Sequence, residues 1–234
     1  MASKGGAAPS TYTPAPTNKT RRPPFFPDSD VDWLRSDGRG FHQCRPAFFQ
    51  TGAVNSAAGS AYAESGKTKV IVSVFGPKES KKAMMYSDTG RLNCNVSYTT
   101  FATTVRGHGS ENKEFSTMLH KALEGAIVLE SFPKTTVDVF ALVLESGGSD
   151  LPVAISCASL ALADAGITMY DLVAGASVSC LGRNLIIDPN FLTITGKWST
   201  ANLNEAMQLC LDACSKLAKI MRSCLKEAAS ASKD

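Results

Sequence analysis

The chain has 234 residues, a formal net charge of +3 and 19% charged residues. That length can bury a sizeable core in one large domain or two small ones. No run of about 18 apolar residues is present, which excludes a transmembrane helix. The first ten residues, MASKGGAAPS, lack the apolar stretch of a secretory signal. We therefore expect no membrane partner.

Residues 1–36 are rich in Pro, Thr, Ala and basic side chains. Because such a segment buries too little apolar surface to offset its ordering entropy, it predicts a disordered tail. The folded domain is expected over residues 37–234. Its first strands are predicted at Ala47–Gln50, Gly59–Glu64 and Thr68–Phe75. Glycine-containing turns separate these strands, which indicates an antiparallel meander whose third strand ends at Gly76-Pro77.

The next two elements are a strand and a helix. Leu92–Phe101 alternates in polarity and should pair with the meander. Ser110–Glu130 has helical periodicity, which predicts an amphipathic helix on the sheet. Its apolar stripe consists of Phe115, Met118, Leu119, Ala122, Leu123 and Ala126.

The segment from Thr136 to Val173 is the predicted core. Val137–Leu144 is apolar on both alternate faces, so this strand should be buried on both sides. Gly147-Gly148 breaks it, and Asp150 can cap the helix that follows. That helix, near residues 151–165, carries one charge, Asp164, and should be the most buried helix. Gly166 ends it, and a second strand should follow.

Short strands are predicted at Ser177–Cys180, Asn184–Ile187 and Phe191–Trp198. Asp188-Pro189-Asn190 is typical of a turn and should join the last two as a hairpin. Asn202, with Glu205 three positions later, indicates the start of the last helix. One face of that helix carries Leu203, Met207, Cys210, Cys214, Leu217, Met221 and Cys224. The whole pattern predicts the α+β class, with helices packed on a mixed sheet.

Seven cysteines are scattered at positions 44, 94, 157, 180, 210, 214 and 224, with no C-x-x-C pair. This pattern is typical of reduced, buried thiols rather than of disulfides or zinc. Cys210 and Cys214 are one helical turn apart, but no third ligand is near them in the sequence. We expect no metal site and no cofactor.

Catalytic motifs are weak. His42, His108 and His120 would serve a triad only if serines and acids converged on them. The GHGS at 107–110 lacks the context of a nucleophile elbow, and no phosphate loop of the G-x-x-x-x-G-K-[ST] type is present. Gly147-Gly148 opens a helix where an anion could bind, but Asp150 would repel it. We interpret this segment as a structural turn.

Basic residues crowd one short region: Lys67, Lys69, Lys78, Lys81, Lys82 and Arg91. Such a cluster could bind a polyanion. A solvated strand edge protected by lysines would give the same pattern. The sequence leaves both readings open.

Four segments together resemble the RNase PH family: DGRGFHQCRP at 37–46, GSAYAESGKTKVIVSVFGPKES at 59–80, FPKTTVDVFALVLESGG at 132–148 and LALADAGITMYDLV at 160–173. The resemblance implies the RNase PH fold, a ribosomal-protein-like βαβ arrangement. Within the family, the chain resembles specifically a ring subunit of the eukaryotic RNA exosome. Among the six ring subunits, the GGSDL turn and ADAGITMYDLV look most like the mRNA-transport-regulator type, in a plant-like version.

The resemblance also implies losses. Active members carry Gly-Gly-Thr-Arg after the core strand, and its arginine holds phosphate; here the turn is Gly147-Gly148-Ser149-Asp150, with one extra residue before the helix. An acidic Asp-x-x-x-Glu-Asp stretch is reduced to Asp188. His120 takes a second basic position. A strand and acidic loop that are usual in the family are missing near residues 189–191.

The resemblance therefore implies a non-catalytic structural and RNA-channel subunit of the exosome ring, acting in RNA 3′-end processing and decay in nucleus, nucleolus and cytoplasm. Expected partners are other RNase PH-like ring subunits, cap subunits and single-stranded RNA. Expected RNA-binding residues are Arg106, Arg91, Lys81 and Lys82. The alternatives are an active phosphate-dependent 3′-to-5′ exoribonuclease and a free-standing RNA-binding protein.

Overall fold

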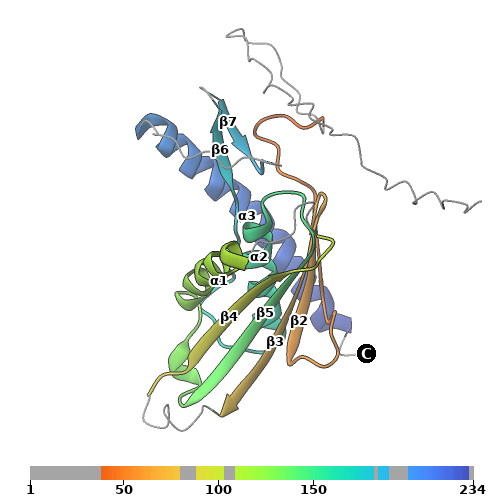
Figure 1. The fold of residues 1–234 in the computed structure, drawn as a ribbon, viewed down its shortest axis with the longest axis vertical. Helices are drawn as coiled ribbons and strands as arrows, with labels where there is room; N and C mark the ends of the chain where they lie inside the picture. Colours follow the sequence, from red (N-terminus) through yellow and green to blue (C-terminus); the bar gives the residue numbers. More distant parts are fainter. Residues whose placement is uncertain (1–37, 80–87, 103–108, 182–183, 190–199, 232–234) are drawn as a thin grey trace, which may run out of the picture. The chain divides into compact units, whose positions relative to one another are not determined.

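The computed structural model describes residues 38–79, 88–102, 109–181, 184–189 and 200–231 (Figure 1). All of them belong to one unit, Leu34–Asp234. The segment 1–36, for which the sequence predicts disorder, lies outside the described residues.

A five-stranded sheet in the order β1-β2-β3-β5-β4 forms the centre of the domain. Its strands are β1 (Ala47–Thr51), β2 (Gly59–Ser65), β3 (Thr68–Glu79), β4 (Arg91–Tyr98) and β5 (Thr135–Glu145). Strands β1, β2 and β3 pair antiparallel, which confirms the predicted meander. Strand β5 pairs antiparallel with β3 and parallel with β4.

Two predictions about this sheet are wrong. Strand β3 continues through Gly76-Pro77 instead of ending there, because a register shift between Phe75 and Lys78 places the proline at an irregularity of the ladder. Strand β4 pairs with β5 and not with the meander. The helix between β4 and β5 returns the chain to the starting end of the sheet, so the two strands run parallel.

The helices are α1 (Gly109–Glu124), α2 (Asp150–Asp164) and α3 (Thr200–Ala231), with a short 3-10 helix η2 (Leu129–Ser131). Helix α2 packs on β2 and β3 and, among the described helices, has the most buried residues, as predicted. Gly59 of β2 lies so close to the end of α2 that a Cβ would be 2.2 Å from the Ala165 nitrogen. Only glycine fits there.

The apolar stripes of α1 and α3 differ in part from the prediction. In α1, Leu119 and Leu123 are fully buried, but Met118 is exposed. Helix α3 begins at Thr200, so Asn202 lies inside its first turn and does not cap it. Leu203 and Met207 are exposed, whereas Ala206, Ala213 and Met221 are buried. The buried line of α3 is therefore rotated relative to the predicted face.

Strand β5 is buried on one face only, which contradicts the prediction of burial on both sides. Val137, Val139, Ala141 and Val143 face the helices and are at most 1% exposed. Phe140 and Leu142, on the opposite face, are 46% and 38% exposed. Figure 1 looks onto this opposite face, with α3 passing behind the sheet. Within the described residues the helices lie on one side of the sheet.

The chain after α2 forms no strand before residue 178, although a strand was predicted there. Gly166 ends the helix as expected, with φ of 70°. Met169 makes only an isolated bridge to Ile127. The Val173 and Gly175 amides donate to hydroxyls of α2, on Ser159 and Ser156, so this segment pairs with helix side chains instead of a ladder.

A second, two-stranded sheet consists of β6 (Val178–Leu181) and β7 (Asn184–Ile187), which pair antiparallel. Both strands were predicted. The predicted partner of β7, Phe191–Trp198, lies outside the described residues, and so do residues 190–191 of the region with the expected missing strand.

Candidate functional site

The turn between β5 and α2 carries the acidic group that the sequence places at a potential anion site. Ser149 is the N-cap of α2, in a left-handed conformation with φ of 56°, and Asp150 is the first helical residue. The sequence offered Asp150 as the cap, and this is wrong because Ser149 takes that position. The extra residue of the turn relative to active family members stays a prediction. The Asp150 carboxylate nevertheless lies at the helix N-terminus, where an anion would bind.

Three hydroxyl groups surround the Asp150 carboxylate. Ser146 donates to its Oδ2 at 2.6 Å, Tyr98 donates to Oδ2 at 3.3 Å, and the Thr68 hydroxyl is 3.2 Å from Oδ1. The Thr68 oxygen also accepts the Gly147 amide at 3.1 Å. These contacts join β3, β4 and the turn. Asp150 is therefore a fixed part of the fold, and its charge opposes a phosphate at this helix end.

Arg45 fills the space between this turn and the end of β7. It is 6% exposed, and its guanidinium donates to four oxygens. Nη1 is 2.9 Å from Gly148 O and 3.4 Å from the Thr68 hydroxyl. Nη2 is 3.0 Å from Pro189 O and 3.3 Å from Asp188 O. The positive charge nearest the turn is thus directed at protein carbonyls.

Asp188 is held on the same network. Its Oδ2 accepts the Arg45 amide at 3.3 Å, and its carbonyl accepts from Arg39 at 3.3 Å. Asp188 has φ of 48°, so two non-glycine residues in this network, Ser149 and Asp188, adopt left-handed conformations. Ser149 lies 2.7 Å from the Ser177 hydroxyl and donates to Pro189 O at 3.1 Å. Asp188, the one carboxylate that the family resemblance leaves of the acidic stretch, is therefore held in place by hydrogen bonds within the fold.

Arg39 and Arg45 were missed as site residues by sequence reasoning. Both lie in DGRGFHQCRP, which was used only as a sign of family resemblance. Arg39 is 8% exposed and also donates to Gln43 O. The available signal for site residues was the position of these two arginines next to glycine and proline. It does not predict burial, because the burial of an arginine depends on tertiary contacts and leaves no periodic pattern in the sequence.

The basic residues of the sequence cluster separate into two ends of the sheet. Lys69 forms an ion pair with Glu145 at 3.1 Å, so its charge is compensated. Lys78 of β3 and Arg91 of β4 lie on either side of Thr136 of β5, at the other end of the sheet. The Lys78 nitrogen is 5.1 Å from the centre of the Phe75 ring. Arg106, Lys81 and Lys82 lie outside the described residues, so their RNA contacts stay predictions, as does that of Arg91.

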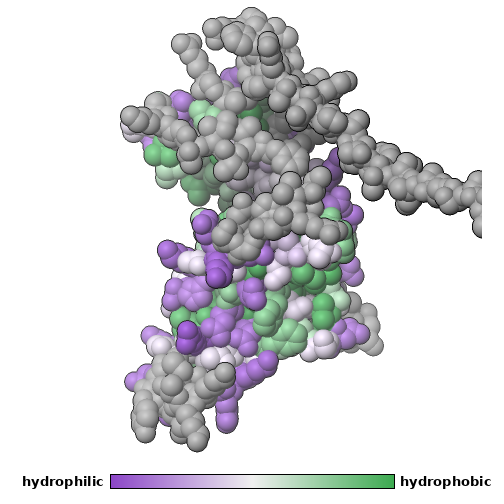
Figure 2. Space-filling view, viewed as in Figure 1, coloured by the Kyte–Doolittle hydropathy of each residue, from purple (hydrophilic) through white to green (hydrophobic). Residues whose placement is uncertain are grey.

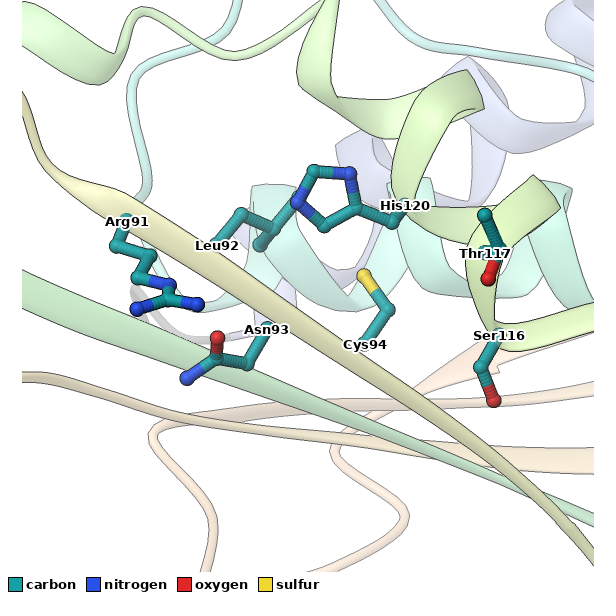
Figure 3. A pocket seen from close by; sticks show the side chains of 7 residues that line it. All are labelled: Arg91, Leu92, Asn93, Cys94, Ser116, Thr117 and His120. Carbon is teal, nitrogen blue, oxygen red and sulfur yellow. The ribbon is translucent and has the colours of Figure 1, made fainter. Parts of the chain in front are cut away.

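A hollow of about 270 Å³ lies between β4 and α1. It is lined by Arg91, Leu92, Asn93, Cys94, Ser116, Thr117 and His120. Figure 3 shows His120 and Leu92 on one side of the strand, with Arg91 and Asn93 on the other. His120 lies 3.6 Å from Glu124, so this second basic position is accompanied by an acid.

The other candidate groups do not converge on a catalytic arrangement. His42 is exposed, and His108 lies outside the described residues. All seven cysteines are free thiols; only Cys157 is fully buried, and six are half-buried. Burial raises the pKa of the Cys94 thiol to about 12. In the part of the chain that the structure describes, no group of three or more His, Cys, Asp or Glu could hold a metal ion, and no helix could cross a membrane.

Comparison with protein families identifies the class of protein that carries this site. Residues 43–168 match the model of the RNase PH, or 3′ exoribonuclease, family, domain 1. The chain belongs to the RNase PH family. It is 66% identical over 255 residues to the Arabidopsis thaliana protein "Exosome complex component RRP41-like", with 99% of both chains covered. It is 38% identical over 161 residues to "Exosome complex component mtr3" of Schizosaccharomyces pombe, with 67% of this chain and 62% of that protein covered.

Solved structures agree with this assignment. The crystal structure of rice (Oryza sativa) Rrp46 is similar, with a TM-score of 0.70 and 27% identity, covering 80% of this chain and 98% of that one. An Archaeoglobus fulgidus exosome with RNA bound to the active site has a TM-score of 0.68 and 19% identity, covering 80% and 92% of the two chains. The α+β, RNase PH-like fold is therefore confirmed. The second likeness concerns the fold alone.

Proposed function

We propose that this protein is a non-catalytic subunit of an exosome core ring. In this role it would support RNA 3′-end processing and 3′-to-5′ decay of rRNA and mRNA, in nucleus, nucleolus and cytoplasm. Its partners would be other RNase PH-like ring subunits, cap subunits and single-stranded RNA threaded through the ring. The names of the Arabidopsis and yeast relatives support the exosome assignment.

The single observation that carries the ring assignment is the face of the sheet on which no described helix packs. We define the open sheet face by Phe48, Ile71, Phe75, Phe140 and Leu142. Phe48 is 53% exposed, and Phe75 and Phe140 form an edge-to-face pair with centroids 5.8 Å apart. Figure 2 shows hydrophobic side chains over the sheet in this view. An apolar patch on a rigid sheet is typical of a protein interface, where aromatic anchors supply much of the binding energy.

The non-catalytic half of the proposal rests on the turn before α2. Phosphorolysis requires inorganic phosphate held in line with the terminal linkage. Asp150 presents a carboxylate where active members of the family place an arginine, and Arg45 is directed at protein carbonyls. Neither group is arranged to hold a phosphate.

The type of ring subunit is a finer question. The GGSDL turn and the ADAGITMYDLV segment favour the mRNA-transport-regulator type. The names of relatives favour an RRP41-like assignment, because the Arabidopsis protein is more similar than the yeast mtr3. The alignment with the Arabidopsis protein spans 255 residues, more than the 234 of this chain, so that relative contains residues with no counterpart here. A missing segment near 189–191 stays a prediction.

The second candidate function is an active phosphate-dependent exoribonuclease. The description of the matching family, 3′ exoribonuclease, favours it. Its chemistry would need a phosphate-binding cation and acidic groups at the turn, and the described residues there offer Asp150 and Asp188 without an outward-facing arginine.

The ring assignment is tested by assembly. The chain is co-expressed with the other RNase PH-like exosome subunits, and the mass of the eluted complex is measured by light scattering. We expect the chain to elute in a ring-sized complex, and Phe140→Ser to reduce that fraction because it removes an aromatic anchor. Leu211→Ser is the matched control, since Leu211 is 68% exposed on α3, away from the open sheet face. A monodisperse monomer that ignores these subunits would overturn the proposal.

A further inference from the structure

The two edge strands of the sheet, β1 and β4, differ in what packs against them. Strand β1, at one edge, is covered by α3, and the Cys224 thiol of that helix donates to Phe49 O at 3.4 Å. Strand β4 lies at the other edge and, among the described strands, pairs with β5 alone. An uncovered strand edge offers main-chain donors and acceptors to any extended chain that reaches it.

The hydrogen-bond register identifies which β4 residues face outward. The Thr99 amide, just after β4, donates inward to Val143 O at 3.0 Å. The Val96 amide donates outward to the Ser116 hydroxyl of α1 at 2.9 Å. Because main-chain groups alternate along a strand, Leu92 and Cys94 face outward with Val96. Among the described residues, the Ser116 hydroxyl accepts from the Val96 amide, and no side chain accepts in the same way from the amides of Leu92 or Cys94.

The hollow beside β4 lies along this same part of the edge. Leu92 and Cys94 line it together with His120 and Thr117 of α1. Helix α1 therefore meets the edge at Val96 and leaves space beside residues 91–94 (Figure 3). A chain entering this space would find main-chain partners at its floor and side-chain room of about 270 Å³.

We propose that the β4 edge at residues 91–94 receives an extended strand of a neighbouring RNase PH-like subunit, which adds to the sheet by main-chain pairing. This inference rests on the proposed ring function. A ring built from head-to-tail contacts requires two different surfaces on each subunit. The open sheet face supplies one, and the β4 edge supplies the second. β-Strand addition of this kind derives affinity from main-chain hydrogen bonds.

The flanking side chains define the chemistry of the incoming strand. One row of its side chains would enter the hollow against Cys94, Thr117 and His120, which favours small polar residues such as serine or threonine. The alternate row would lie beside Arg91 and Asn93, which favours polar or acidic residues. Asn93 already donates to Asp138 of β5 at 2.8 Å, so Arg91 is the cation at this position among the described β4 side chains.

The test is residue-resolved amide exchange in the free chain and in the assembled ring. We expect the Leu92 and Cys94 amides to gain at least about tenfold protection on assembly, as expected for new main-chain hydrogen bonds. The Val96 amide, already bonded to Ser116, serves as the internal control and should change less. If the chain enters the ring while Leu92 and Cys94 exchange as in the free protein, the inference is wrong and the proposed function stands. Failure of the chain to enter any ring would contradict the proposed function and this inference together.

A pair of variants separates main-chain pairing from side-chain packing. Cys94→Pro removes the outward amide and leaves the inward ladder to β5 intact, since proline is tolerated at an edge position of this kind. Cys94→Ala removes the thiol but keeps the amide. In pairwise co-expression with each other ring subunit, Cys94→Pro should weaken one pairing by at least about tenfold, and Cys94→Ala by less than about threefold. Equal losses in both variants, or no loss in a folded Cys94→Pro chain, would overturn the inference.

Discussion

Arg45 has a structural role in the candidate site. Its guanidinium joins three segments that are distant in sequence: the turn at Gly148, Thr68 on β3, and the end of β7 at Asp188 and Pro189. Buried arginine is stable only when such acceptors satisfy it. Removing the arginine would take one donor from each of these acceptors and break the link between the three segments.

Replacing Arg45 by methionine should therefore destabilise the folded chain. Methionine has a similar length but removes the four hydrogen bonds of a buried guanidinium to Gly148 O, the Thr68 hydroxyl, Asp188 O and Pro189 O. We therefore expect the free energy of unfolding to fall by about 2–4 kcal/mol. Urea unfolding monitored by fluorescence or circular dichroism measures this change. The control is Arg222→Met, whose exposed ion pair with Asp171 should contribute little to stability because solvent screens it. Similar losses in the two variants would show that Arg45 is not a structural bridge.

At the scale of elements, Arg222 and Asp171 connect α3 to the segment after α2. The two Asp171 oxygens accept from Arg222 Nη2 at 3.0 and 2.9 Å. The Arg222 hydrogen bond, followed by the Leu172 amide, lowers the pKa of the Asp171 carboxyl below 3.8. A lowered pKa in the folded state means that the contact stabilises the fold above about pH 4 and is lost as the pH falls below that value.

The pH dependence of Arg222→Gln tests this connection. The variant should be slightly less stable than the parent at pH 7. The difference should shrink as the pH falls below about 4, toward the lowered pKa at which folded Asp171 becomes protonated. Urea unfolding of both proteins at pH 3, 5 and 7 provides the measurement. A difference that is constant over this range would mean that the carboxylate charge does not contribute.

Some of the helices and strands could be predicted from the sequence alone, and others could not. The meander, the buried helix α2 and the strands β6 and β7 were predicted because each has a local signal, either alternation, a long apolar run or a glycine at its end. The burial of β5 on one face was not predicted, since Phe140 and Leu142 have the same apolar character as core residues. Whether such a face meets a helix of its own chain or another protein is a tertiary property.

The position of Asp150 in the candidate site was predicted, and the architecture around it was missed. Asp150 was expected to oppose an anion, and its place at the start of α2 agrees with that expectation. The roles of Arg39 and Arg45 required the fold, because their partners lie up to 149 residues away in the sequence. Arg106, Lys81 and Lys82 stay predictions from family resemblance.

At the scale of the whole molecule, the proposal is a scaffold that keeps a catalytic fold without catalytic chemistry. An arginine attracts phosphate and a carboxylate repels it. For unit charges about 4 Å apart at an effective dielectric of about 20, the interaction is on the order of 4 kcal/mol before salt and solvation reduce it. Asp150 places a negative charge where active family members place the positive charge of an arginine, and Asp188 is the single carboxylate left from their acidic stretch. We therefore expect this turn to support neither phosphate binding nor acid catalysis.

The most direct measurement is phosphate-dependent release of nucleoside diphosphate from a 3′-labelled oligoribonucleotide. The purified chain is compared with Asp188→Asn and with a reaction lacking enzyme, at several phosphate concentrations. We expect no phosphate-dependent release above the blank from either protein. Phosphate-dependent release by the parent chain, lost in Asp188→Asn, would contradict the account and show that the site is catalytic.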